Sequence, residues 1–245
     1  MRMIKLTGLL FIIFGVYWLS LEARRFLKTD SLFQTGHIFF EKSNLLNHPE
    51  VMKISEANYN LNIFAFNLWK IKKTLENIPQ VRKVIVKRKF PNIVEIRLEE
   101  RKPLFLLNWK ESFYGVDKDG YIFPQLEGNP CWDLPVITGL NDKYLENFFS
   151  AGEILPEIIL ALKINDYFKG NRPGPLKLSE VHFGDFDEFS LYTFNPRMGL
   201  RFTKDGFKKG FENLDLVLAD FDRGAGSIDS MDLRFPEKVF IHLKG

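Results

Sequence analysis

An uncharged apolar segment near the start of the chain constrains the fold more than any other feature. Between Lys5 and Glu22, the stretch from Leu6 to Leu21 carries no charged side chain. As a helix rising 1.5 Å per residue it would be about 24 Å long, slightly shorter than the roughly 30 Å hydrocarbon core of a bilayer. Lys5 can extend its long side chain toward the headgroups, which lengthens the usable segment. The segment therefore predicts a membrane helix.

A cleaved signal peptide is the alternative interpretation of this segment. Its apolar core would be longer than usual, and Ala23 has Leu21 two positions before it where a small residue is needed. Tyr17 and Trp18 near the far end suit an interfacial aromatic belt. We therefore expect an uncleaved anchor at 6–22. Basic residues flank both ends, but the bulk of the chain follows the segment, which favours a single-pass type II orientation.

The expected organisation has five parts in sequence order. They are a cytoplasmic tail at 1–5, the anchor at 6–22, a linker at 23–35, a first domain at 36–101 and a second domain at 102–245.

Composition favours folded domains and argues against nucleic acid as the main partner. Hydrophobic residues make up 45% of the 245 residues, which is enough for more than one core, and the net charge is only +3. A dedicated nucleic-acid binder needs a concentrated basic face. The single cysteine, Cys131, excludes a disulfide within the chain.

The sequence contains no familiar catalytic or cofactor motif. G-x-S-x-G, Walker, G-x-G-x-x-G and H-E-x-x-H patterns are all absent. A glycine-rich loop at 222–227 follows a helical pattern and precedes a strand, which is the reverse of a phosphate-binding loop. The histidines have no ligand-type partner at metal-binding spacing, and they are His37, His48, His182 and His242. We therefore predict no catalytic, cofactor or metal site.

Residues 36–101 have the pattern of a small α+β domain. The segment from His37 to Phe40 predicts a strand. Pro49 and the apolar residues after it predict a short helix with Asn47 as its cap. Asn67 can cap a second helix, in which apolar residues recur with a period near 3.6.

A β-hairpin completes the β-α-α-β-β order of this domain. Val84 and Val86 precede the turn Phe90-Pro91-Asn92, and the second strand alternates apolar and charged residues. Its apolar residues are Val94, Ile96 and Leu98.

The first strand of this hairpin is strongly basic, through Arg82, Lys83, Lys87, Arg88 and Lys89. Such a cluster suits nucleic acid or anionic lipid. A solvated strand face explains it more simply, because its lysines would lie opposite Glu95 and Glu99 across the hairpin.

The hairpin sequence resembles the end of a POTRA domain. The POTRA pattern runs P-x-V, then V-x-V-x-R-x-[FW]-P-[ND], then E-R-x-P, and it is matched by residues 79–81, 84–92 and 100–103. The x-G-N turn usual in these domains falls at 40–44, where Lys42 or Ser43 replaces the glycine. This turn therefore departs from the pattern.

Residues 102–245 predict a second, mixed β-rich domain with an antiparallel sheet and flanking helices. Asp119-Gly120 is a strong hairpin turn, and Tyr121 at a ligand position argues against a calcium loop there. Helical spacing of apolar residues predicts helices around 155–162 and 207–218. Strand patterns lie at 104–109, 113–116, 121–123, 181–183, 189–192 and 199–202.

The last segment resembles the final hairpin of the FtsQ/DivIB cell-division family. That hairpin has the form φ-D-L-R-[FY]-x-x-x-φ-x-φ, where φ is apolar, and 231–241 follows it. Residues 134–139 are similar to the family's LP-φ-φ-TG step. A single POTRA-like domain directly after an anchor is also typical of the family.

This resemblance implies a structural and interaction protein with no enzymatic activity and no cofactor. It implies a single-pass protein of the cytoplasmic (inner) membrane at the division septum, with the POTRA and β domains outside. The implied partners are FtsB- and FtsL-like proteins and other divisome members. Through them the protein would help assemble and regulate septal peptidoglycan synthesis.

The resemblance also implies a partner-binding site in the last hairpin, where FtsQ-like proteins receive a β-strand from FtsB. The matching residues are Arg234, Phe235, Val239, Phe240, Ile241, His242 and Leu243. Alternation would turn Val239, Ile241 and Leu243 toward the core, and a strand at the sheet edge would keep free N–H and C=O groups on one side. The competing interpretation is that this strand only completes the fold.

Two other function classes stay open. A POTRA-containing secretion or outer-membrane assembly factor would handle extended client chains. A periplasmic enzyme or binding protein released by signal cleavage would need convergent polar residues in a pocket.

Overall fold

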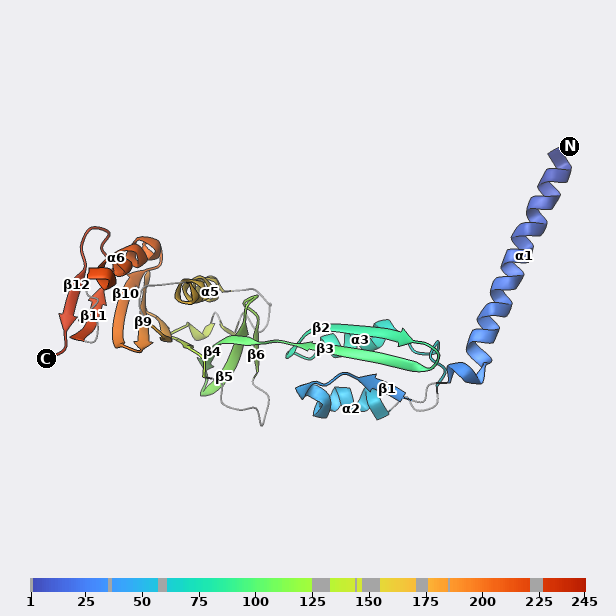
Figure 1. The fold of residues 1–245 in the computed structure, drawn as a ribbon, viewed down its shortest axis with the longest axis horizontal. Helices are drawn as coiled ribbons and strands as arrows, with labels where there is room; N and C mark the ends of the chain where they lie inside the picture. Colours follow the sequence, from blue (N-terminus) through green and yellow to red (C-terminus); the bar gives the residue numbers. More distant parts are fainter. Residues whose placement is uncertain are drawn as a thin grey trace. The chain divides into compact units, whose positions relative to one another are not determined.

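The computed structural model describes most of the chain, and it forms two compact units, Met1–Arg101 and Lys102–Gly245 (Figure 1). The described backbone covers 2–34, 37–56, 61–124, 133–143, 145–146, 155–170, 176–184, 186–220 and 227–245; side chains at 2–7, 9, 10 and 37 are outside the description.

The first unit begins with a single long helix, α1 (Arg2–Thr29). This helix continues to residue 29, so the first part of the segment expected as a linker is helical. A 3-10 turn, η1 (Ser31–Phe33), follows it, with Asp30 as its N-cap. Over the residues that the structure describes, no helix combines the length and the apolar character that crossing a membrane requires.

The rest of the first unit confirms the predicted β-α-α-β-β order. Its elements are β1 (His37–Phe40), the 3-10 turn η2 (Asn44–Asn47), α2 (Pro49–Glu56), α3 (Leu68–Glu76), β2 (Val81–Lys89) and β3 (Ile93–Glu100). The sheet order is β1-β3-β2, with β1 parallel and β2 antiparallel to the central strand β3. One face of β3 is fully buried, because Val94 and Ile96 are both 0% exposed.

Helix α3 starts where the sequence predicts. The Asn67 side chain accepts a hydrogen bond from the Lys70 N–H (3.0 Å), which satisfies one of the free amides of the first turn. The predicted Asn47 cap of α2 is wrong, because Asn47 belongs to η2. His48 takes that place, and its Nδ1 accepts from the Glu50 N–H (3.3 Å).

The turn at 40–44, which departs from the POTRA pattern, is held by a carboxylate from the far end of β3. Glu100 accepts hydrogen bonds from the Ser43 hydroxyl (2.8 Å) and from the Asn44 backbone N–H (2.7 Å) and side-chain amide (3.0 Å). Ser43 in turn caps η2. Next to it, two hydrogen bonds from Arg97 lower the pKa of Glu41. Side chains therefore fix this turn.

The basic residues of β2 do not share one environment. Arg82 forms an ion pair with Glu99 (3.1 Å). The Arg88 guanidinium donates hydrogen bonds to the carbonyl oxygens of Ile63 and Phe66, each at 2.9 Å. Lys83 and Lys87 lie opposite glutamates in the hairpin register, as expected.

The second unit is a mixed sheet with helices, not an antiparallel one. Its strands are β4 (Pro103–Trp109), β5 (Ser112–Asp117), β6 (Ile122–Pro124), β7 (Val136–Thr138), β8 (Leu178–Phe183), β9 (Glu188–Phe194), β10 (Arg197–Thr203), β11 (Ile228–Asp232) and β12 (Phe240–Leu243), and its helices include α5 (Pro156–Lys169) and α6 (Phe207–Asp220).

The described strands follow the order β12-β11-β10-β9-β8-β7-β4-β5-β6. The β4–β7, β7–β8 and β10–β11 pairs are parallel, which corrects the expectation of an antiparallel sheet. A parallel pair needs a crossover rather than a tight turn. Helix α5 provides it between β7 and β8, and α6 provides it between β10 and β11.

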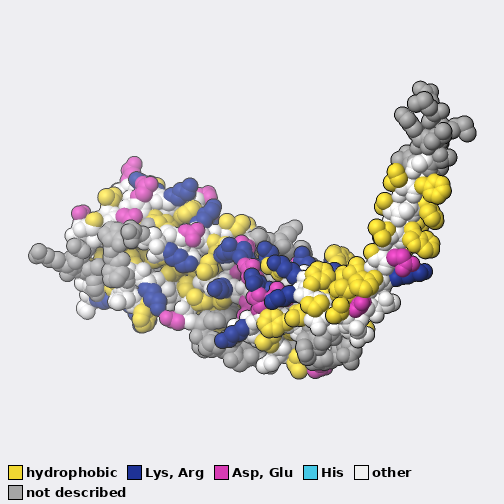
Figure 2. Space-filling model, turned by 45° about the vertical axis from the view of Figure 1, so that its right-hand side comes forward, with side chains coloured by type: hydrophobic (Ala, Val, Ile, Leu, Met, Phe, Trp, Pro, Cys, Tyr) yellow, Lys and Arg dark blue, Asp and Glu magenta, His cyan; other side chains and the backbone are white. Residues whose placement is uncertain are grey.

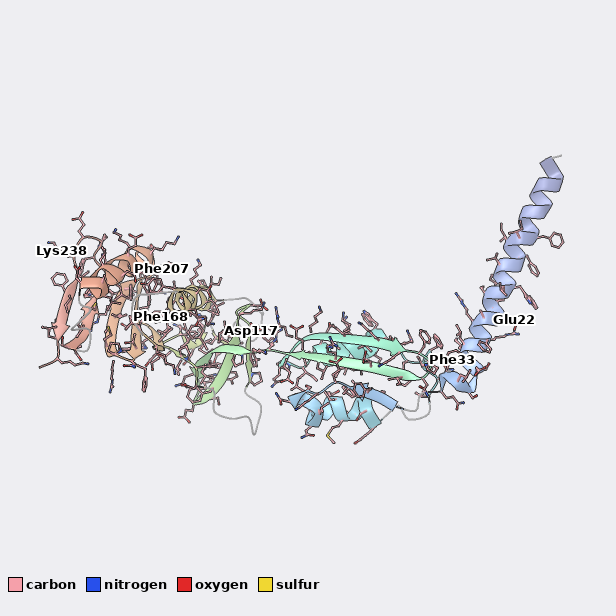
Figure 3. The ribbon with its side chains drawn as sticks, viewed as in Figure 1. Glu22, Phe33, Asp117, Phe168, Phe207 and Lys238 are labelled. Carbon is pink, nitrogen blue, oxygen red and sulfur yellow. The ribbon has the colours of Figure 1, made fainter. Side chains whose placement is uncertain are left out.

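Aromatic rings fill the core beneath these helices. Tyr167 of α5 stacks on Phe211 of α6 with ring centroids 3.6 Å apart. Phe168 and Phe207, labelled in Figure 3, pack edge-on against the same Phe211 ring. The phenylalanine-rich composition therefore serves core packing here.

Local turn geometry accounts for the buried carboxylate of Asp117 and for the glycine at 139. Asp117 accepts from the N–H groups of Asp119 and Tyr121, so its buried carboxylate stabilises the turn. Gly139 has a φ of +75°, and a Cβ there would lie 2.0 Å from the Phe183 carbonyl oxygen. Only glycine fits this position after β7.

Candidate interaction edge

Strand β12 lies at one end of the second sheet. It pairs antiparallel with β11, with Asp232 opposite Phe240 and Ser230 opposite His242. No other described strand pairs with its outer side. The structure therefore places the last strand at an edge, where backbone groups on one side lack partners from the sheet.

The turn between β11 and β12 is short and tied to helix α6. The Lys238 N–H donates to the Phe235 carbonyl oxygen (3.5 Å), which puts Pro236 at the second position of a β-turn. The Asn213 side-chain amide donates to the Pro236 carbonyl oxygen (3.0 Å). Sequence reasoning missed Asn213, because nothing in a helical stripe shows which polar residue reaches a distant turn.

The Arg234 side chain donates hydrogen bonds to carboxylates of its own chain. It forms a forked pair with Asp232 (2.9 and 2.6 Å) and a third bond to Glu188 at the start of β9 (2.6 Å). Hydrogen bonds to Asp232 and then to Glu188 raise the pKa of Arg234, and the bond from Arg234 lowers the pKa of Asp232. Arg234 therefore positions the turn rather than presenting a free charge.

Two aromatic rings form the exposed side of the hairpin. Phe235 and Phe240 meet edge to face with centroids 5.5 Å apart, and they are 46% and 50% exposed. The Arg234 guanidinium lies 5.8 Å from the Phe235 ring centre and supports it from within the hairpin. We call Phe235 and Phe240 the edge aromatic pair.

The other predicted site residues divide between core and surface. Val239 and Ile241 are half-buried and pack against the core of the second unit. Leu243, which the alternation pattern directs to the same face, is 61% exposed because it extends past the core. His242 is exposed.

One hydrogen bond at the end of β12 indicates which of its backbone N–H groups face β11. The Lys244 N–H donates to the Ser227 carbonyl oxygen on the β11 side (2.8 Å). Backbone groups alternate sides along a strand, so the N–H of His242 also points to β11 and those of Ile241 and Leu243 point outward. Leu243, not His242, therefore carries an outward N–H.

Two sequence features near this unit lie outside the described residues: Cys131 and most of the glycine-rich loop at 222–227. Among the described residues, no group of three His, Cys, Asp or Glu side chains is arranged to hold a metal ion.

Comparison with known proteins identifies the relatives of this chain. The model of the "POTRA domain, FtsQ-type" family matches residues 33–101. The cell division protein FtsQ of Syntrophotalea carbinolica is 25% identical over 222 residues, which cover 90% of this chain and 78% of the relative. FtsQ of Geotalea daltonii is 22% identical over 233 residues, covering 93% and 80%. The chain is similar to FtsQ cell-division proteins over most of its length, and its first unit contains a POTRA domain of the FtsQ type.

The FtsQ/DivIB likeness extends beyond the POTRA domain. The 222 residues matched to the first relative exceed the 101 residues of the first unit, so the match includes part of the second unit. The major extracytoplasmic domain of DivIB from Geobacillus stearothermophilus was also found, with 18% identity and a TM-score of 0.31, over 52% of this chain and 98% of that one.

Proposed function

We propose that this chain is a bitopic membrane scaffold of the bacterial divisome. It binds FtsB- and FtsL-like partners through the domains that follow its anchor, and so helps assemble and regulate septal peptidoglycan synthesis. The proposed organisation keeps the predicted tail, anchor, linker, POTRA domain and β domain. Similarity to FtsQ cell-division proteins supports a role in cell division, and the partners and the regulatory role are our inference from the edge strand.

The proposal rests on the position of β12 at the edge of the sheet. An edge strand with outward N–H groups at Ile241 and Leu243 can add a partner strand by backbone hydrogen bonding. The edge aromatic pair lies beside that edge and offers apolar surface to the partner's side chains. Asp232 and Glu188 fix the Arg234 guanidinium, which lies 5.8 Å from the Phe235 ring centre, and this support reduces the ordering needed on binding.

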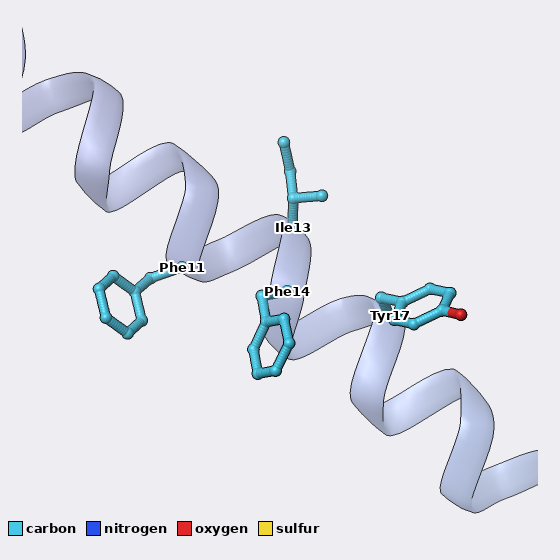
Figure 4. A pocket seen from close by; sticks show the side chains of 4 residues that line it. All are labelled: Phe11, Ile13, Phe14 and Tyr17. Atoms are coloured by element: carbon cyan, nitrogen blue, oxygen red, sulfur yellow. The ribbon is translucent and has the colours of Figure 1, made fainter.

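Helix α1 supports the proposed anchor. Large apolar side chains from Phe11 to Leu21 are exposed on all sides of it, for example Phe11 at 79% and Leu19 at 70%. Figure 4 shows Phe11, Ile13, Phe14 and Tyr17 on this helix, and together they line a shallow hollow. A helix that is apolar all round is stable when lipid surrounds it. We propose that it crosses the inner membrane with the rest of the chain outside.

A matched pair of substitutions at Leu243 tests the edge mechanism. Leu243→Pro removes an outward N–H, and proline is tolerated on the free side of an edge strand. Leu243→Ala removes most of the side chain and keeps the N–H. In pull-downs of the full chain from membranes with its FtsB-like partner, we expect Leu243→Pro to reduce capture about tenfold, since a lost hydrogen bond plus an unmet partner group is worth about 1.4 kcal/mol.

The controls separate backbone from side-chain effects. Leu243→Ala is expected to change capture only slightly, and Phe235→Ala to weaken it about fivefold through lost apolar contact. His242→Pro removes an N–H that points to β11, so it should disturb the strand itself. Capture by Leu243→Pro at the level of the unchanged chain would exclude strand addition at this edge.

A further inference from the structure

Four phenylalanine rings meet where α1 joins the first unit. Phe26 of α1 packs edge-on against Phe33 (6.0 Å), and Phe33 packs against Phe64 (5.4 Å) and Phe90 (6.5 Å). Phe64 and Phe90 also touch, at 5.9 Å. We call these four residues the aromatic foot. Figure 2 shows hydrophobic side chains gathered beside this end of α1, and Figure 3 labels Phe33 there.

Hydrogen bonds fix the aromatic foot to the end of the helix. The Asn62 side-chain amide donates to the carbonyl oxygens of Leu27 and Lys28, both at 2.9 Å, and so satisfies two acceptors of the last turn of α1. The Ile63 N–H donates to the Phe33 carbonyl oxygen (2.7 Å). The helix therefore ends on the loop that carries Phe64.

The aromatic foot leaves much apolar surface uncovered. Phe90 is 63% exposed and Phe26 is 55% exposed, and Leu32, which precedes Phe33 in the sequence, is 61% exposed. Core packing would not leave two phenylalanines so open, and within the described residues no further segment covers them. The surface suits an apolar or interfacial environment.

The charges around the aromatic foot are mostly basic. Arg24, Arg25 and Lys28 lie on the last turns of α1, and Lys89 precedes Phe90 at the hairpin turn. Two acids lie on the same segment. Glu22 pairs with Arg25 (3.3 Å), and the Asp30 carboxylate accepts from a backbone N–H. Aromatic rings flanked by lysine and arginine are the usual composition of a membrane interface.

The distance along α1 matches the depth of that interface. Phe26 follows Leu21, the end of the uncharged segment, by five residues, which is about 7.5 Å of helix. The headgroup region on each side of the hydrocarbon core is about 5 to 7.5 Å thick, so 7.5 Å reaches its outer part. A helix that ends its apolar part at Leu21 therefore places Phe26 at the headgroups.

We propose that the aromatic foot inserts into the headgroup layer of the bilayer that α1 crosses. The ligand is a phospholipid surface, with the basic residues favouring anionic headgroups. This rests on the proposed membrane anchor, and it adds a second contact that sets how the POTRA domain stands on the membrane.

Fluorescent labels at three sites test this in the full chain, with Cys131→Ser as the background. The chain is reconstituted in vesicles of zwitterionic and anionic phospholipid that carry a nitroxide on either the headgroup or the acyl chain. Single cysteines are placed by Phe90→Cys, Lys83→Cys and Val16→Cys. Lys83 is the matched control, because it is exposed on β2 and lies seven residues, about 23 Å, before Phe90, which directly follows this strand.

We expect headgroup nitroxide to quench the label at 90 at least threefold more than the label at 83, and acyl-chain nitroxide to quench the label at 16. Equal quenching at 90 and 83, with 16 quenched, overturns the aromatic-foot proposal and leaves the anchor standing. Absence of quenching at 16 overturns the anchor, and the aromatic-foot proposal with it.

Discussion

Arg234 connects three parts of the second unit through one side chain. Its guanidinium binds Asp232 two residues before it and Glu188 at the start of β9, and it lies against Phe235. The family motif suggests a partner-binding residue, and the contacts assign it a positioning role. The bond to Glu188 spans 46 residues of sequence, so the motif alone gave no sign of it.

Asp232→Asn tests this network through its pH dependence. Folding lowers the pKa of Asp232 below its ordinary value of 3.8, so the unfolded chain binds more protons as the pH falls through that range. The stabilisation is therefore present at neutral pH and lost below about pH 4. We expect the substitution to lower the free energy of unfolding by about 1 kcal/mol at pH 7 and by much less at pH 3.

Urea unfolding of the full chain in detergent measures both values. Asp229→Asn is the control, because Asp229 is an exposed carboxylate on the same strand. An equal loss at pH 7 and pH 3 would show that Asp232 stabilises the hairpin by some means other than its charge.

Local sequence patterns predicted most strands and helices, but they did not predict which strands pair or in which direction. The first-unit hairpin and the Asn67 cap follow from neighbouring residues. The parallel placement of β7 between β4 and β8 does not, because period-2 alternation is the same for either strand direction. Motif resemblance predicted a partner site in the last hairpin, which lies at the edge of the sheet. Glu188 and Asn213, which support this hairpin, were not predicted because they are remote in sequence.

Residues on one face of β2 are buried to different degrees, and the alternation of apolar residues does not predict this difference. Val84 and Val86 lie on the same face, but Val84 is 2% exposed and Val86 is only half-buried. We expect Val84→Asp to unfold the first unit, since an unpaired buried carboxylate costs several kcal/mol, and Val86→Asp to weaken it less.

Limited proteolysis of the full chain, with fragments mapped by mass, resolves the two units. Val84→Asp should expose cleavage sites within residues 37–101 and leave 102–245 resistant. Resistance of the first unit equal to that of the unchanged chain would mean that this face of β2 is not its core.

At the scale of the whole molecule, the proposed function needs both an anchored end and a binding end. The full chain is expected to stay in the membrane fraction after carbonate extraction, because the segment from Leu6 to Leu21 is uncharged and no cleavage signal follows it. Immunoblotting of the fractions measures this. Recovery of a soluble form that begins near Ala23 or Arg24 would show a cleaved signal instead.

Residue-resolved amide hydrogen exchange measures directly whether a partner strand pairs with the outer side of β12. In the free chain in detergent, the His242 amide should exchange slowly, because it bonds to β11, and the Ile241 and Leu243 amides should exchange fast. Saturating FtsB-like partner should slow exchange at Ile241 and Leu243 by about tenfold or more and leave His242 unchanged. A bound partner with unchanged exchange at Leu243 would contradict the account.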